Sequence, residues 1–359
     1  MQKDWMKPTE IFAFVRALPP WLLIIASIFL AACSSAIFEV TLQGAGATFP
    51  NPIYQEWFLT YAAKHPNVAF DYQAIGSSGG QRQILDRTVD FAASDAPLKD
   101  RDLASTQGTI IHIPSVLGAV AITYNLPSLT GELNLTPEIL SNIYLGKIRK
   151  WDDSAIKAVN RALSLPAAEI RVAHRSDGSG TTFVLTDYLS KVNQEWSNKI
   201  GAGTLVDWPA GIGAKGNEGV AQLAAQTIHS IAYVELKYAM DNRLRYASIM
   251  NAAGVFIKPT LESITAAAGA AQAPEDLRVS ITNAPGKDAY PISSFTYLLV
   301  YQDQSDPIKG RVLVDFLWWA THDGQGAARQ MSYAPLPGDI VRKVENKIGR
   351  IAFQGKPLR

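Results

Sequence analysis

Three short turns rich in glycine and serine hold the residues of this 359-residue chain that are best suited to chemistry. They are residues 44–50 (Gly-Ala-Gly-Ala-Thr-Phe-Pro), 76–80 (Gly-Ser-Ser-Gly-Gly) and 175–182 (Arg-Ser-Asp-Gly-Ser-Gly-Thr-Thr). Glycine lets the backbone approach a ligand closely, while serine and threonine cap a following helix or donate a hydroxyl hydrogen. The free N–H groups and positive dipole end of a helix favour an anion. Together with Arg175 and Asp95, the three turns predict a cage for a tetrahedral oxyanion.

The same turns are also compatible with one enzyme hypothesis. Residues 76–80 satisfy Gly-x-Ser-x-Gly, which would make Ser78 the nucleophile of a secreted serine hydrolase. Such a serine needs a histidine within hydrogen-bond reach, and no local signature marks any of the five histidines, His65, His112, His174, His229 and His322. No Walker lysine follows a glycine loop, and one cysteine with scattered histidines predicts no metal site. We therefore expect a binding protein without a cofactor, not an enzyme.

Six segments in order along the chain resemble the phosphate-binding protein of the bacterial high-affinity phosphate ABC transporter. They are residues 44–50, 75–80, 90–97, 143–153, 175–181 and 213–219. The resemblance implies a two-lobed periplasmic-binding-protein fold (type II-like) that closes around phosphate. Carried over by position, the residues lining the site are Thr48, Phe49, Ser77, Asp95, Arg175, Ser179, Gly180 and Thr181.

The chemistry of these side chains agrees with phosphate as the ligand. The hydroxyl groups can donate, Phe49 and Gly180 offer backbone N–H groups, and Arg175 supplies a full positive charge on a planar fork. We expect Asp177 to orient Arg175. Asp95 can accept a hydrogen bond from a P–OH group, whereas sulfate would offer it only repulsion. A receptor for another oxyanion, sulfate or molybdate, is the alternative within the same class.

The elements that must position these residues alternate between strand and helix. Strands are predicted at 38–42, 68–75, 90–94, 169–174 and 230–235, and helices at 52–65, 81–88, 137–145, 151–160, 181–196, 217–226 and 309–322. Residues 266–274 are interpreted as a surface loop. The alternation predicts an α/β fold whose lobes each hold a mixed, mostly parallel sheet flanked by helices. Two long apolar segments, 108–125 and 290–301, are expected to join the lobes as crossing strands.

The domain boundaries follow from those segments. Residues 37–114 and 293–359 are predicted to form lobe I, and residues 115–292 lobe II. Residues 1–32 end in a twelve-residue apolar run, which is shorter than the ~20 residues needed to span a bilayer but suits an export signal. Leu-Ala-Ala before Cys33 resembles a lipobox, so Cys33 is the expected lipidation site. A general secretory cleavage after Ala36 is the alternative.

Charge excludes some partners. Without residues 1–32 the chain has 30 basic and 30 acidic residues. A chain of zero net charge has no electrostatic footprint for nucleic acid, so anion affinity must come from local groups. We expect an exported monomer in the periplasm or at the cell surface, anchored in the membrane through Cys33. Its expected partners are inorganic phosphate and the permease and ATPase subunits of the phosphate transporter.

Overall fold

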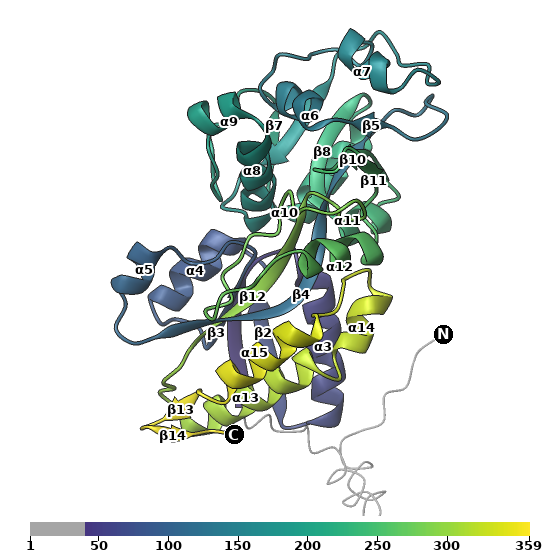
Figure 1. Ribbon diagram of the computed structural model, residues 1–359. Coiled ribbons are helices and arrows are strands. Elements are labelled where there is room, and N and C mark those ends of the chain that lie inside the picture. The colour runs from purple at the N-terminus through teal and green to yellow at the C-terminus, as the bar shows by residue number, and fades with distance from the viewer. Residues whose placement is uncertain (1–39) are drawn as a thin grey trace, which may run out of the picture. The chain divides into compact units, whose positions relative to one another are not determined.

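Strands and helices alternate along residues 40–359, which are the residues that this computed structural model describes (Figure 1). The chain begins with β1 (Val40–Gly46), α3 (Asn51–Lys64), β2 (Val68–Gln73), α4 (Ser77–Leu85), β3 (Phe91–Ser94), α5 (Asp100–Ala104) and the long strand β4 (Ile110–Tyr124). The middle contains β5 (Asn134–Leu135), α6 (Pro137–Tyr144), α7 (Ser154–Val159), β6 (Arg171–Arg175), α8 (Gly180–Val192), α9 (Gln194–Lys199), β7 (Ile212–Ala214), α10 (Gly216–Gln226), β8 (Ser230–Glu235), α11 (Leu236–Asp241), β9 (Arg245–Tyr246), β10 (Ser248–Met250), β11 (Phe256–Ile257) and α12 (Leu261–Gly269). The last part holds β12 (Ser293–Tyr301), α13 (Pro307–Thr321), α14 (Gln325–Gln330), α15 (Gly338–Ile348), β13 (Ala352–Phe353) and β14 (Lys356–Pro357).

One mixed sheet runs through this part of the chain in the order β2-β1-β3-β12-β4-β8-β6-β7. Strand β1 pairs in parallel with β2 and β3, and β6 pairs in parallel with β7 and β8. The antiparallel pairs are those that β4 and β12 make. The α/β class with a mixed sheet flanked by helices is therefore confirmed.

The strands that pair in parallel form two parallel groups, one of β1, β2 and β3 and the other of β6, β7 and β8. Strand β4 connects the two parallel groups because it pairs with two partners in succession. Its residues 110–119 pair with β12, and residues 120–124 pair with β8. Every residue of β4 and β12 is buried. Strands covered on both faces need no alternation of polar and apolar residues, which is why both segments are continuous apolar runs in the sequence.

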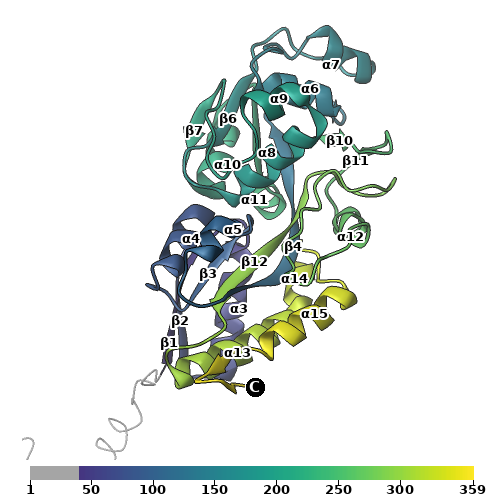
Figure 2. The same cartoon turned by 60° about the vertical axis from the view of Figure 1, so that its left-hand side comes forward.

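Helices gather around each parallel group (Figure 1, Figure 2). Helices α3, α4, α13 and α15 lie with β1, β2 and β3 at one end, and α6, α8, α9 and α10 lie with β6, β7 and β8 at the other. Strands β4 and β12 run from one group toward the other. The lobe boundaries at 114/115 and 292/293 stay predictions.

Glycine allows α4 to rest directly on β1. A Cβ on Gly80 would lie 2.5 Å from Cα of Gly46, which is too short for two carbon atoms that are not bonded to a common atom. Gly46 itself has a φ of 143°, which side-chain-bearing residues rarely adopt. These two glycines therefore fix the first turn of α4 beside the carboxyl end of β1.

The structure corrects several expected element bounds. Residues 181–196 are not one helix, because Asn193 interrupts it and accepts a 2.8 Å hydrogen bond from Trp196 N to cap α9. The expected loop 266–274 is helical up to Gly269, because a capping box of Thr260 and Ser263 starts α12 and its alanines favour helix. Helix α4 begins four residues before position 81, and α7 covers only part of 151–160. The predicted export signal, Cys33 and the start of the predicted strand 38–42 lie outside the described residues.

Candidate functional site

The predicted site residues lie at the carboxyl ends of strands from both parallel groups. Thr48 and Phe49 follow β1, and Asp95 follows β3. Arg175 is the last residue of β6, while Ser77 opens α4. Ser179 is the N-cap of α8, followed by Gly180 and Thr181 in its first turn. The edge beyond the carboxyl ends of parallel strands is where α/β folds bind ligands.

These residues are closed off from solvent. Ser77, Ser179 and Thr181 are 0% exposed, Arg175 and Asp95 are 2% exposed, and Thr48 is 9% exposed. A buried polar group is costly unless it has a hydrogen-bond partner. The arrangement therefore depends on the partners that each side chain finds.

Arg175 is held by a two-pronged ion pair with Asp177. Its Nε donates to Oδ1 at 2.7 Å and its Nη2 donates to Oδ2 at 2.5 Å. Burial works against the Asp177 carboxylate, but the hydrogen bonds and charge of Arg175 hold the pKa of Asp177 below its usual range. The backbone N–H of Gly216 also donates to Asp177 Oδ1 at 3.0 Å. Asp177 thus fixes one edge of the guanidinium, as expected for a residue that orients Arg175.

The other edge of Arg175 faces the cage. Nη1 donates to Thr181 Oγ1 at 3.5 Å, a long and weak contact. The backbone N–H of Arg175 donates to the hydroxyl of Tyr233 at 3.0 Å. The guanidinium is therefore fixed on one side and has donor capacity left on the side of the hydroxyl groups.

Asp95 is the acidic member of the site. Thr296 donates to its Oδ1 at 2.7 Å, and Ser77 Oγ lies 3.5 Å from its Oδ2. Burial raises the pKa of Asp95 to about 7, although the hydrogen bond from Thr296 and the charge of Arg175 oppose this shift. A carboxyl group in this state holds or shares a proton near neutral pH. In its ionised form, Asp95 can accept a hydrogen bond from a ligand that carries a proton and repels an anion that carries none.

Residues from the two parallel groups touch across the site. Gly180 lies so close to Asp95 and Ser77 that a Cβ on it would overlap Asp95 Oδ2 and Ser77 Oγ. Ser78 N donates to Gly178 O at 3.1 Å, and Tyr238 OH donates to Thr48 O at 2.7 Å. The structure therefore has the site in a closed arrangement.

The structure brings most of the predicted residues into one connected cluster. Asn217 joins Thr48 to Thr181, which contacts Arg175, and Gly180 lies against Asp95 and Ser77. Two of the predicted residues, Phe49 and Ser179, contribute to the cluster in other ways. The Phe49 ring is buried in the core against Gly118, so only its backbone is left for a ligand. The Ser179 hydroxyl accepts from Thr182 N at 3.1 Å as a helix cap, which leaves its hydrogen available.

Sequence reasoning missed three polar residues at the site. They are Asn217, Tyr233 and Thr296, which contact Thr48, Arg175 and Asp95 respectively. Asn217 lies in a segment that carries the family resemblance, and this was the one available signal. Tyr233 and Thr296 stand in buried strands, where a polar residue in an apolar run is the only hint.

The geometry does not support the hydrolase reading. Ser78 Oγ donates to Thr204 Oγ1 at 2.9 Å. The buried ring of His112 instead accepts from Leu98 N at 3.0 Å, and His174 Nδ1 lies 3.1 Å from Arg175 O. No histidine is bonded to Ser78 in residues 40–359, and this part of the chain contains no cluster of metal-ligating side chains.

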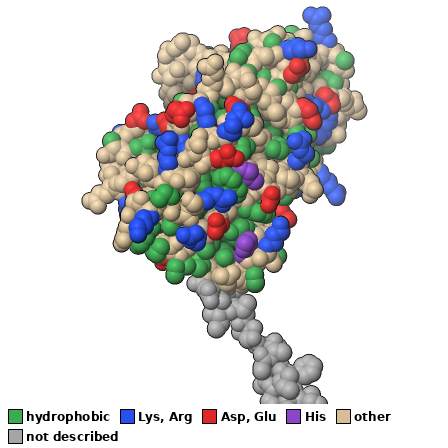
Figure 3. All heavy atoms as spheres, turned by 60° about the horizontal axis from the view of Figure 1, so that its bottom comes forward, with side chains coloured by type: hydrophobic (Ala, Val, Ile, Leu, Met, Phe, Trp, Pro, Cys, Tyr) green, Lys and Arg blue, Asp and Glu red, His purple; other side chains and the backbone are tan. Residues whose placement is uncertain are grey.

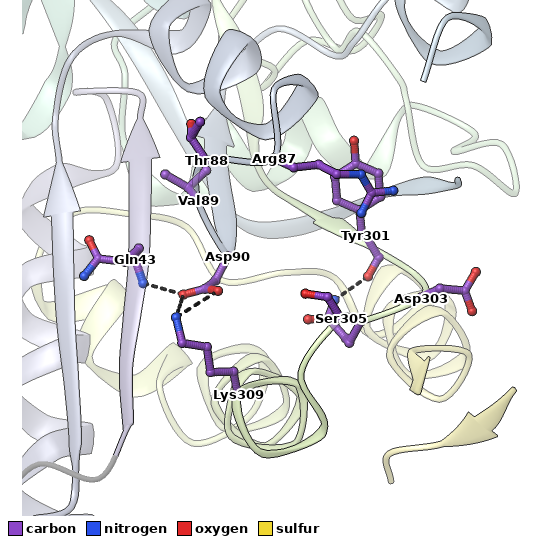
Figure 4. Close-up of a pocket in the computed structure, with 10 residues that line it drawn as sticks. Gln43, Arg87, Thr88, Val89, Asp90, Tyr301, Asp303, Ser305 and Lys309 are labelled. Carbon is purple, nitrogen blue, oxygen red and sulfur yellow. Dashed lines mark hydrogen bonds and ion pairs between the residues drawn. The ribbon is translucent and has the colours of Figure 1, made fainter. Parts of the chain in front are cut away.

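A second pocket lies at the opposite, amino-terminal side of β1 and β3 (Figure 4). It has a volume of about 330 Å³ and includes Asp90 and Lys309, which form a 2.9 Å ion pair. The guanidinium of Arg87 stacks on the Tyr301 ring at 3.6 Å. Asp90, Lys309 and Arg87 thus have partners within the pocket wall, and the pocket shares no residue with the cluster around Arg175.

The face of the molecule at the bottom of Figure 1 has mixed charge. Figure 3 shows basic and acidic side chains interspersed on the face at the bottom of Figure 1, without a field of one sign. In residues 40–359, no helix combines the length and apolarity that a membrane crossing requires.

Comparison with known proteins places the chain in a family. Residues 35–323 match the family described as the PBP superfamily domain. The phosphate-binding protein PstS of Pasteurella multocida (strain Pm70) is 44% identical over 308 residues, which cover 85% of this chain and 89% of the relative. The protein of the same name from Methanocaldococcus jannaschii is 37% identical over 337 residues, covering 87% and 86%. The subatomic-resolution structure of a high-affinity periplasmic phosphate-binding protein (PfluDING) bound with phosphate matches with a TM-score of 0.70 at 24% identity. The match covers 86% of this chain and 93% of that chain, which supports the fold.

Proposed function

Because this chain belongs to the PBP superfamily and, within it, to the phosphate-binding proteins, we propose that it binds inorganic phosphate outside the cytoplasmic membrane. It then delivers the ion to the permease of a phosphate ABC transporter for import. The observation that carries this proposal is the closed cluster in which buried Arg175 contacts the hydroxyl group of Thr181 and buried Asp95 contacts those of Thr296 and Ser77. A single fixed cation, hydroxyl donors and one acceptor match an oxyanion that carries a proton.

Each residue has a definite role in this proposal. Arg175 neutralises charge, while Thr48, Ser77, Ser179 and Thr181 donate hydroxyl hydrogens. Phe49 and Gly180 donate backbone N–H groups. The N–H groups of Gly180 and Thr181 lie in the first turn of α8, where they have no acceptor within the helix. Asp95 accepts the P–OH hydrogen. Asp177 keeps Arg175 in place.

Binding is coupled to movement of two lobes. Residues 37–114 with 293–359 form one lobe, residues 115–292 form the other, and β4 and β12 cross between them. The burial of the cluster supports this, since an ion cannot reach residues that are at most 9% exposed unless the segments separate. Closure then removes water and strengthens every polar contact to the ion.

Export and anchoring complete the proposal. Residues 1–32 act as a lipoprotein-type export signal, and Cys33 becomes the lipid-bearing first residue of a monomeric receptor that is not an enzyme. Stable anchoring takes more than one acyl chain. Mass spectrometry of the mature amino terminus tests this, and an unmodified terminus beyond Cys33 contradicts it.

Calorimetry on the mature protein, stripped of bound ligand, tests the ligand. We expect phosphate to bind with 1:1 stoichiometry, and sulfate and molybdate to bind far more weakly. A thermal shift and compaction in small-angle scattering should accompany phosphate only. Tight sulfate or molybdate binding without phosphate binding would assign the site to another oxyanion, and no binding of any of the three ions would refute the oxyanion proposal.

A further inference from the structure

We propose that Asn217 is a positioning residue that makes the hydroxyl groups of Thr48 and Thr181 donate to the bound ion. This inference rests on the proposed phosphate site, to which it adds the reason why two hydroxyl groups that could accept or donate are held as donors. Asn217 is 0% exposed and is the second residue of α10.

The orientation of the Asn217 amide is fixed by the backbone. The N–H of Glu235 donates to Asn217 Oδ1 at 2.9 Å. A backbone N–H group can only donate, so the oxygen of the amide must point toward Glu235 and the NH₂ group must point the other way. Both hydrogens of that NH₂ group therefore face the cage.

The two hydrogens have two partners. Asn217 Nδ2 donates to Thr48 Oγ1 at 2.9 Å and to Thr181 Oγ1 at 3.0 Å. These threonines stand at the starts of different segments, one after β1 and the other in the first turn of α8. One amide thus sets the separation and direction of two hydroxyl groups from opposite sides of the closed site.

The donors that surround each threonine oxygen decide where its own hydrogen can go. Thr48 Oγ1 also lies 3.3 Å from the backbone N of Asn217, and Thr181 Oγ1 lies 3.5 Å from Arg175 Nη1. Within residues 40–359, every hydrogen-bond partner of these two oxygens is a donor. A hydroxyl group has two acceptor sites and one hydrogen, so each hydrogen remains to be donated into the cage.

A preset hydroxyl direction improves binding because the protein has already paid the cost of ordering the donor. Without the amide, each hydroxyl could rotate, or could donate to a neighbouring oxygen when the site is empty. We therefore expect Asn217→Ala to weaken phosphate binding about 10- to 100-fold, which is about 1–3 kcal/mol for two donors.

A double-mutant cycle separates positioning from a purely structural role. Phosphate dissociation constants are measured by calorimetry for the parent, Asn217→Ala, the pair Thr48→Val with Thr181→Val, and the triple variant. If Asn217 acts through the two hydroxyl groups, its removal should change affinity less than threefold once they are gone. Equal losses in both backgrounds would overturn the proposal, because Asn217 would then act independently of the threonines.

Asn160→Ala is the matched control. Asn160 is 4% exposed and its amide also makes several hydrogen bonds, to Asn134 and Ile156, but it contacts no residue of the cluster. It should lower the melting temperature of the ligand-free protein and leave phosphate affinity within threefold. If the parent binds no phosphate, the proposed function fails. If the parent binds and Asn217→Ala binds equally well, only the role of Asn217 fails.

Discussion

Gly180→Ala should abolish tight phosphate binding without destabilising the protein. The added Cβ would overlap Asp95 Oδ2 and Ser77 Oγ and would lie 2.7 Å from Asp95 Cβ. Carbon atoms in contact are normally about 3.5–4.0 Å apart. The segments that carry Gly180 and Asp95 must therefore separate by about 1 Å or more, and the closed site cannot form.

The size of the loss follows from the contacts that depend on closure. Thr48, Ser77 and Asp95 lie on one side and Arg175 and Thr181 on the other, so a site held open keeps only one set. Losing two or three hydrogen bonds to a charged ligand, at about 1.5–3 kcal/mol each, removes at least about 3 kcal/mol. That corresponds to an increase in Kd of at least about a hundredfold.

Folding should respond in the opposite direction. Alanine is more favourable than glycine by up to about 1 kcal/mol inside a helix, and Gly180, as the first residue of α8, should gain less than this. Ligand-free Gly180→Ala should therefore melt at the parent's temperature or slightly above it. This combination separates a blocked site from a damaged fold.

The assay is calorimetry with phosphate, together with melting and small-angle scattering. Gly326→Ala is the control, because Gly326 is also in the first turn of a helix and no atom lies within 4 Å of its added Cβ. Phosphate affinity of Gly180→Ala within threefold of the parent, with the same compaction, would refute the reasoning.

Four further predictions concern three charged groups, Arg175, Asp95 and Glu235. Arg175→Ala should cost at least ~2–5 kcal/mol in phosphate binding, because it leaves Asp177 unpaired and removes the cation of the cage; calorimetry showing a loss below threefold contradicts this. Asp95→Asn should lower the ratio of phosphate affinity to sulfate affinity at fixed pH, and an unchanged ratio means that sulfate is rejected by other groups. The raised pKa of Asp95 also predicts a pH dependence of the free energy of unfolding of the ligand-free protein. The contribution of Asp95 is fully present near pH 4 and falls by up to about 4 kcal/mol as the pH rises through about 7. Denaturant titrations of Asp95→Asn should lack this decline. Burial likewise raises the pKa of Glu235 well above its usual range, and its Oε1 has no partner among residues 40–359. Glu235→Gln should therefore gain stability relative to the parent between pH 5 and pH 8, and parallel pH profiles for the two proteins would contradict a buried neutral carboxyl.

Much of the fold could be predicted because its signals are local. Continuous apolar runs marked β4 and β12, since strands buried on both faces have no polar alternation. Proline at the start of α3 and the glycine-rich segments at the starts of α4 and α8 placed helix beginnings within a few residues. Predictions failed where a local signal was ambiguous, as at Asn193, whose capping of α9 depends on a side-chain bond that a helical period does not reveal.

Residue type and neighbours a few positions away indicate which chemical groups stand at the turns: the hydroxyl groups, the glycines, Arg175 and Asp177. The Arg175–Asp177 pair could be anticipated for the same reason. Which distant groups meet depends on the folded arrangement of the whole chain. Thr296 reaches Asp95 across 201 positions, and Asn217 reaches Thr48 across 169. Such contacts depend on the strand order that brings β12 beside β3 and on the approach of α10 to the turn after β1. In the sequence Asn217 is one polar residue at a helix start, and only the closed packing of the segments turns it into a bridge between two hydroxyl groups.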